Sequence, residues 1–203
     1  MTNTMPTHVY GRSGALQERF GIDQNTGPLL AAILIFGGNT ENHLERAIWR
    51  LEDWTPDGSR PPTDARTISD LIKMLADVAR GLEANETRRM LESWCETATM
   101  AFQLRNNIAH GMSVRMGDAT AYFQNPRWGG VQRKRPSKDF WPDEHVLTML
   151  RDCFATLLRI IAAVAQAKDV ASDALAMRAL HEAKAILSEF SDPMAYNPTF
   201  EKY

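Results

Sequence analysis

Apolar residues recur at helical spacing in five segments of this chain, and no other feature restricts its fold so strongly. The segments run from Gly27 to Leu51, from about Ile68 to Leu82, from near Glu86 to His110, from Trp141 to at least Ile161, and from Ser172 to Phe190. Each apolar stripe must be buried against another element of the chain. We therefore predict an all-α fold, a four- to five-helix bundle.

Glycine, proline and capping residues mark the ends of the expected helices. Gly37 and Gly38 weaken the middle of the first long helix, where we expect a kink or a break. Asn85 is expected to cap the helix that ends at His110. Gly111 follows that helix at the position where a left-handed residue commonly ends one.

Two short strands are expected after His110. Met112–Met116 and Ala119–Phe123 flank Gly117 and Asp118, a pair suited to a tight hairpin turn. A basic stretch from Gln124 to Asp139 follows and contains too much proline for a long regular element. The hairpin and this basic loop are therefore predicted as an insertion between the third and fourth helices of the bundle.

These boundaries divide the chain into three parts. Residues 1–26 form an irregular N-terminal arm with one possible helical turn at Ala15–Phe20, and residues 191–203 form a C-terminal tail. Between them, residues 27–190 form a single helical domain that includes the hairpin and the basic loop at about 112–141.

Charge and cysteine content limit the classes of function. The net charge is -2 and the pI about 6.2, so any contact with nucleic acid must come from a local basic patch. Cys95 and Cys153 both lie in apolar helical patterns, which predicts buried thiols in a reducing cytoplasm and not a disulfide or a metal site. The longest apolar run, Leu29–Phe36, is too short to span a membrane.

The sequence Arg-Asn-Asn-Ile-Ala-His, residues 105 to 110, ends the third predicted helix and is called here the motif. At about 100° per residue, Arg105 falls within the apolar stripe of that helix, whereas Asn106 and His110 lie one turn apart on its flank. A charged group in a helix seam requires a partner or a function. Arg105 and His110 diverge by about 140°, which favours a site that spans two subunits.

Arginine and histidine are sufficient for metal-free attack on a phosphodiester. A histidine that titrates near neutrality removes a proton from a ribose 2′-hydroxyl or returns one to the leaving oxygen. Arginine stabilises the charged oxygens of the phosphorane. We assign Arg105 and His110 to these roles, and Asn106 to orienting His110 or the phosphate.

The motif resembles the arginine, polar residue and later histidine of HEPN domains, which lies late in a long helix of an α-bundle. The resemblance is strong over the motif and loose from about Leu29 to Lys168. It implies a HEPN-like bundle and a metal-independent endoribonuclease, or a relative that binds without cutting. It further implies a homodimer through the motif helix and a toxin or antiphage setting with an antitoxin or regulatory protein as partner. Met112 replaces a tyrosine that is modified in some toxin members, which argues against that form of control.

The basic loop supplies candidate RNA contacts. Its cationic side chains would follow the RNA backbone, and Trp128 or Trp141 would stack on a base. These RNA-binding candidates are Arg127, Trp128, Arg133, Lys134, Arg135 and Lys138. A solvated charge cluster is the alternative interpretation of the loop.

Other interpretations of the motif also remain open. Arg105 could pair with a carboxylate while His110 caps the helix, or the chain could be a non-catalytic module that binds RNA, a nucleotide or a protein, or a dimerisation domain. His43 has no second ligand at metal-binding spacing, and no phosphate-binding glycine loop is present, so we expect no metal and no cofactor.

Overall fold

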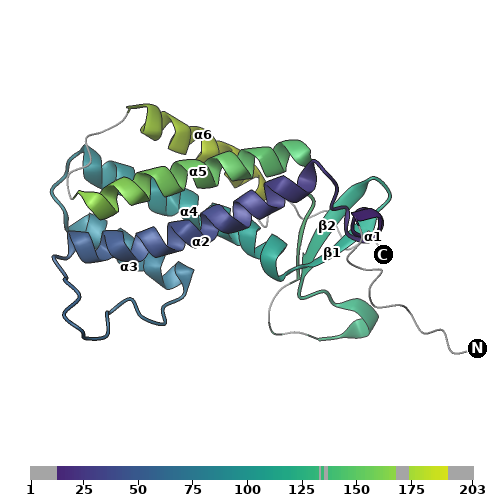
Figure 1. The fold of residues 1–203 in the computed structure, drawn as a ribbon, viewed down its shortest axis with the longest axis horizontal. Coiled ribbons are helices and arrows are strands. Elements are labelled where there is room, and N and C mark those ends of the chain that lie inside the picture. Colours follow the sequence, from purple (N-terminus) through teal and green to yellow (C-terminus); the bar gives the residue numbers. More distant parts are fainter. Residues whose placement is uncertain (1–12, 133, 135–136, 168–173, 192–203) are drawn as a thin grey trace, which may run out of the picture.

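A computed structural model describes residues 13–132, 134, 137–167 and 174–191, and it is mainly helical, as predicted. Figure 1 shows a helical bundle with a small sheet at one end, where the fourth helix leads into the first strand. The elements are α1 (Ser13–Phe20), α2 (Thr26–Leu51), α3 (Ile68–Gly81), α4 (Glu86–His110), β1 (Met112–Met116), β2 (Ala119–Gln124), β3 (Lys138–Phe140), α5 (Glu144–Gln166) and α6 (Ala174–Ser191).

The core lies between α4 and the helices around it. The α2 and α5 helices run side by side, and α4 packs against both α3 and α6. Trp94 of α4 is fully buried, and its indole N–H donates to the carbonyl of Leu157 at 2.9 Å. Phe102 of α4 meets Phe154 of α5 edge to face, with ring centroids 5.1 Å apart. These contacts fix the position of the helix that carries the motif.

Side-chain caps begin three of the helices. The Asn85 side chain accepts the Arg88 N–H at 3.0 Å, which confirms the predicted start of α4. Asp143 accepts the Val146 N–H at 2.7 Å at the start of α5. At the start of α3, Thr67 forms a reciprocal capping box with the third residue of that helix.

The break expected at the middle of α2 is absent. The helix is continuous from Thr26 to Leu51, although Gly37 and Gly38 lie at its middle. Gly37 is buried, and its bare backbone lies against Arg105 of α4 and Phe154 of α5. Tertiary packing along α5 therefore overrides the low helix propensity of the glycine pair.

The hairpin is present, but it is part of a three-stranded antiparallel sheet in the order β1-β2-β3. Met112 pairs with Phe123 in the first ladder, and Gly117 takes a left-handed φ of 65° in the turn. The third strand begins in the basic stretch, where we expected no long regular element, and its last residue, Phe140, pairs with Tyr122. Both Tyr122 and Phe140 are buried in the core, and this burial stabilises a strand that the sequence does not indicate.

The N-terminal arm is less irregular than predicted, because Ser13–Phe20 forms α1 and packs on the sheet. Arg115 of β1 donates to the carbonyl of Gln17 at 2.9 Å, and Ser113 donates to that of Phe20 at 3.0 Å. The rest of the arm, residues 1–12, and the tail from residue 192 onward lie outside the described residues. Among the described helices, none is long and apolar enough to cross a membrane.

Candidate functional site

Arg105 lies at the junction of three helices. A Cβ added at Gly37 of α2 would lie 3.5 Å from the Arg105 Nε and 3.7 Å from the Phe154 ring of α5. The side chain is half-buried, and its Nε has no contact with solvent. The position predicted for Arg105 in the helix seam is therefore confirmed, and the glycine leaves the space that the guanidinium group fills.

The charge of Arg105 is not neutralised by any carboxylate among the described residues. Its NH1 group donates to the Asn106 side-chain oxygen at 3.1 Å, which is a neutral acceptor. Its Nε has no hydrogen-bond partner in the described part of the chain. Because a half-buried cation without a counter-ion is costly, this arrangement favours an anion as ligand.

The Asn106 side chain contacts the arginine of the motif, and it makes no hydrogen bond with the His110 side chain. Besides accepting from Arg105, Asn106 accepts a hydrogen bond at its backbone carbonyl from the Gln124 side chain of β2 at 2.6 Å. Asn106 also lines a small cavity of about 100 Å³ between α3 and α4, together with Lys73 and Gln103. Gln124 thus fastens the sheet to the last turn of the motif helix.

His110 is the last residue of α4, and its side chain is exposed. The imidazole makes no hydrogen bond or ion pair with any of the residues that the structure describes. The imidazole is therefore free to meet a substrate or a second protein chain. Arg105, in contrast, is held inside the bundle, so the two side chains occupy different environments.

The left-handed conformation expected at Gly111 is wrong. Its φ and ψ are -80° and 157°, because the extended strand β1 begins at the next residue. Glycine is required there by a close approach: an added Cβ would lie 2.1 Å from the carbonyl oxygen of Asn107. That oxygen accepts the Gly111 N–H at 2.9 Å. The glycine therefore allows α4 to turn directly into the sheet.

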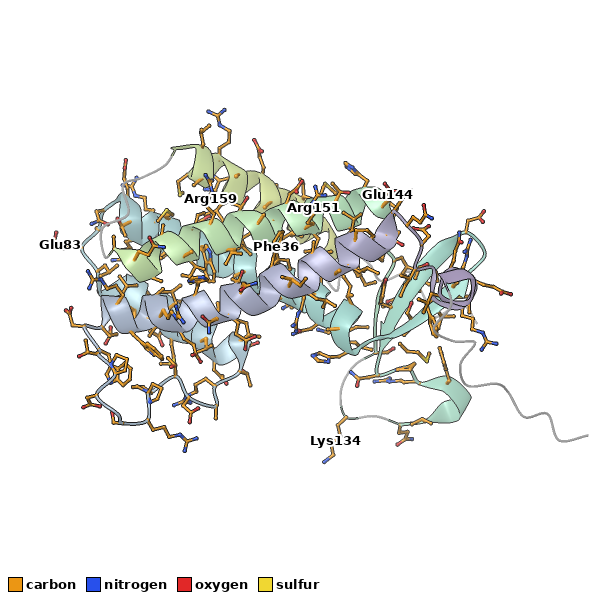
Figure 2. The ribbon with its side chains drawn as sticks, viewed as in Figure 1. Phe36, Glu83, Lys134, Glu144, Arg151 and Arg159 are labelled. Atoms are coloured by element: carbon orange, nitrogen blue, oxygen red, sulfur yellow. The ribbon has the colours of Figure 1, made fainter. Side chains whose placement is uncertain are left out.

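The candidate RNA contacts lie on and beside the sheet. Trp128 is 56% exposed, and its ring meets Phe123 of β2 at a centroid distance of 5.9 Å. Arg127, Lys134 and Lys138 are exposed as well, and Figure 2 shows Lys134 at the sheet end of the molecule, far from Glu83. The remaining two candidates, Arg133 and Arg135, lie outside the described residues.

Two neighbouring residues of β2 connect the candidate RNA-binding surface to the motif helix. Phe123 supports Trp128, and Gln124 binds the backbone of Asn106. Sequence reasoning missed Gln124, for which no local signal exists, and it misread Gly37. For Gly37 the available signal was a glycine within an otherwise uninterrupted apolar stripe.

No protein-family model matches the chain, and no curated protein or solved structure matches it. Within the described residues, no group of three or more histidine, cysteine, aspartate or glutamate side chains is arranged to hold a metal ion.

Proposed function

We propose that the chain is a metal-independent endoribonuclease of the HEPN type, with the motif of α4 as its active site. The observation that carries the proposal is the half-buried Arg105, which has a neutral acceptor at one nitrogen and no carboxylate partner among the described residues. A fixed, half-buried cation without a counter-ion is suited to a phosphate. The resemblance of the motif to HEPN domains supplies the reaction class.

The reaction would be an internal transfer at phosphorus. The ribose 2′-oxygen attacks the phosphorus, its proton passes to a base, and the bond to the 5′-oxygen breaks as that oxygen takes up a proton. The products are a 2′,3′-cyclic phosphate and a 5′-hydroxyl. Arg105 would stabilise the charge on the phosphorane oxygens, and His110 would transfer the proton. Asn106 would hold the guanidinium group through the hydrogen bond at 3.1 Å.

The sheet would bind the RNA beside the scissile bond. The exposed indole of Trp128, supported by Phe123, offers a face on which an unpaired base can stack. Arg127 and Lys138 lie close to it in the sequence and are exposed to solvent, where they would meet phosphates. A stacking platform of this kind favours a single-stranded segment of RNA over a continuous duplex.

The partner would be a second copy of the chain. Arg105 is held against α2 and α5, whereas His110 is exposed at the end of α4. A two-fold arrangement of two α4 ends would place the histidine of one subunit beside the arginine of the other. The resemblance further suggests a toxin or antiphage effector that is restrained by an antitoxin or another regulatory protein.

Cleavage of RNA in excess chelator tests the proposal. Wild type should cut single-stranded RNA and leave 2′,3′-cyclic phosphate ends. Arg105→Ala and His110→Ala should each lower the rate by about 10²-fold or more. The matched controls are Arg89→Ala on the exposed face of α4 and His181→Ala on α6, which should retain wild-type rates. Binding without cleavage by wild type would identify a non-catalytic module, and equal cleavage by His110→Ala would refute the proposed chemistry.

Mixing the two inactive variants tests whether the site spans two subunits. In a mixed dimer of Arg105→Ala and His110→Ala, one of two composite sites receives both intact side chains. Random exchange should therefore restore about a quarter of wild-type activity, because half of the dimers are mixed and half of their sites are intact. No recovery after verified subunit exchange would place both residues in a site within one chain.

A further inference from the structure

A second cavity lies at the end of the bundle away from the sheet, and its walls have a different chemistry. It has a volume of about 350 Å³ and lies between the end of α2, the loop that follows it and one face of α3. In Figure 1 this loop extends from the bundle at the end opposite β1 and β2. The proposed ribonuclease function does not involve this region.

Two tryptophans form the aromatic wall of the cavity. Trp49, at the end of α2, and Trp54, in the loop, have ring centroids 5.0 Å apart and planes inclined by 59°. Ile48, Met74 and Val78 supply aliphatic walls. Two inclined indole rings beside aliphatic side chains are suited to binding a cation that carries apolar groups.

Hydrogen bonds hold the Trp49 indole and the backbone of Trp54 in place. The Trp49 indole N–H donates to the hydroxyl of Thr63 at 2.8 Å, and Thr63 is fully buried. The Trp54 backbone N–H donates to the Trp49 carbonyl at 2.8 Å, since Asp53 turns the chain with a positive φ of 53°. The aromatic wall is therefore formed before any ligand binds, which lowers the entropic cost of binding.

The electrostatic field of the cavity favours a positive charge. Glu52 and Asp77 are the ionisable residues that line it, and no basic side chain joins them among the described residues. Arg80 pairs with Asp77, but both side chains are about two-thirds exposed, so the pair is weak and screened by water. The cavity also lies at the C-terminus of α2, where the helix dipole adds partial negative charge.

We propose that this cavity binds an organic cation with a methylated ammonium head group. Trp49 and Trp54 would contact the methyl groups by cation–π attraction, while Glu52 and Asp77 would balance the charge. The volume accommodates such a head group with a short chain. The same chemistry occurs in free choline-like molecules and in the trimethylated lysine of a protein.

Titration with choline, followed by NMR of the tryptophan indole N–H signals, tests the proposal. The signals of Trp49 and Trp54 should shift and saturate, whereas those of Trp94 and Trp128 should stay unchanged. The neutral isostere 3,3-dimethylbutan-1-ol should bind at least about fivefold more weakly, because it lacks the charge. Equal binding of the isostere, or no saturable shift up to about 50 mM choline, well above a millimolar Kd, would overturn the proposal.

Variants separate the aromatic from the ionic contribution. Trp54→Leu should weaken choline binding at least about tenfold, and Trp54→Phe, which keeps an aromatic ring, should weaken it less. Asp77→Asn should weaken it by a smaller factor. Asp152→Asn on α5 is the matched control, because that carboxylate is 63% exposed and also paired with a neighbouring arginine. Wild-type affinity in both Trp54 variants would overturn the proposal.

A peptide comparison identifies the source of the cation. A short peptide with trimethylated lysine is compared with the unmodified peptide under the same conditions. Tighter binding of the modified peptide than of free choline supports a protein side chain as ligand. Binding of choline alone supports a free small molecule. If neither probe shifts the two indole signals, the cavity is not an ammonium site.

Discussion

Substitution of Gly111 by alanine should strongly destabilise the end of α4, where the candidate site lies. In Gly111→Ala the new Cβ would lie 2.1 Å from the Asn107 carbonyl oxygen, and even a 3.0 Å contact requires a shift of about 0.9 Å. The obstructing atom is backbone, so no side-chain rotation relieves the clash. The shift would also stretch the hydrogen bond of 2.9 Å between these two residues.

The expected loss of stability follows from these two effects. Overpacking costs about 1–3 kcal/mol and a lost hydrogen bond about 0.5–1.5 kcal/mol, so Gly111→Ala should lower the free energy of unfolding by about 1.5–4.5 kcal/mol. Urea unfolding measures the change as a lower midpoint at constant slope. The clash lies between α4 and β1, so proteolysis should become faster at this junction first.

Gly38→Ala is the matched control for this experiment. A Cβ at Gly38 meets nothing within 4 Å, and the residue lies inside α2. Relief of the low helix propensity of glycine should raise the stability by about 0.5–1 kcal/mol. If Gly111→Ala were as stable as Gly38→Ala, the close approach at the end of α4 would not exist, and our account of how the helix enters the sheet would be wrong.

Three further predictions concern other parts of the molecule. Burial raises the pKa of Cys95 and of Cys153 to about 12. Neither thiol should therefore react with a disulfide reagent at pH 8 until urea unfolds the chain. Fast labelling of the native protein would contradict this prediction. Ala65→Gly should stabilise by about 0.5–1 kcal/mol in thermal unfolding, since Ala65 has a strained φ of 58°; no gain would contradict the strain. Hydrogen bonds from Thr26 hold the pKa of Asp23 below its usual value. Its stabilisation is therefore present above about pH 4, the unfolded pKa of an aspartate, and is lost as pH falls further, so the stability difference between wild type and Asp23→Asn should be smaller at pH 3 than at pH 6.

Local rules predicted the parts of the fold that local interactions determine. The Asn85 side chain caps α4 by accepting from a backbone N–H only three residues away, and Gly117 forms the hairpin turn. Neighbouring residues were therefore sufficient to predict both features. The helical face of Arg105 also follows from periodicity alone. These predictions needed no knowledge of what lies across the bundle.

Other features depend on residues that are distant in the sequence. Gly37 does not break α2 because Arg105 and Phe154 pack on it from other helices. Lys138 lies in a strand because Phe140 is buried beside Tyr122. The aromatic cavity likewise requires the loop after α2 to fold back on α3. Composition and periodicity contain none of these long-range contacts.

The last turn of a helix is an unfavourable place for an anion, because its unpaired carbonyl oxygens carry partial negative charge. One carbonyl in the last turn of α4 has an additional donor from outside the helix: the Gln124 side-chain amide lies against that of Asn106. Its dipole sets a partial positive charge next to that oxygen. The second strand of the sheet therefore acts as an electrostatic screen, and it makes the terminus beside Arg105 less repulsive to a phosphate than a bare helix end would be.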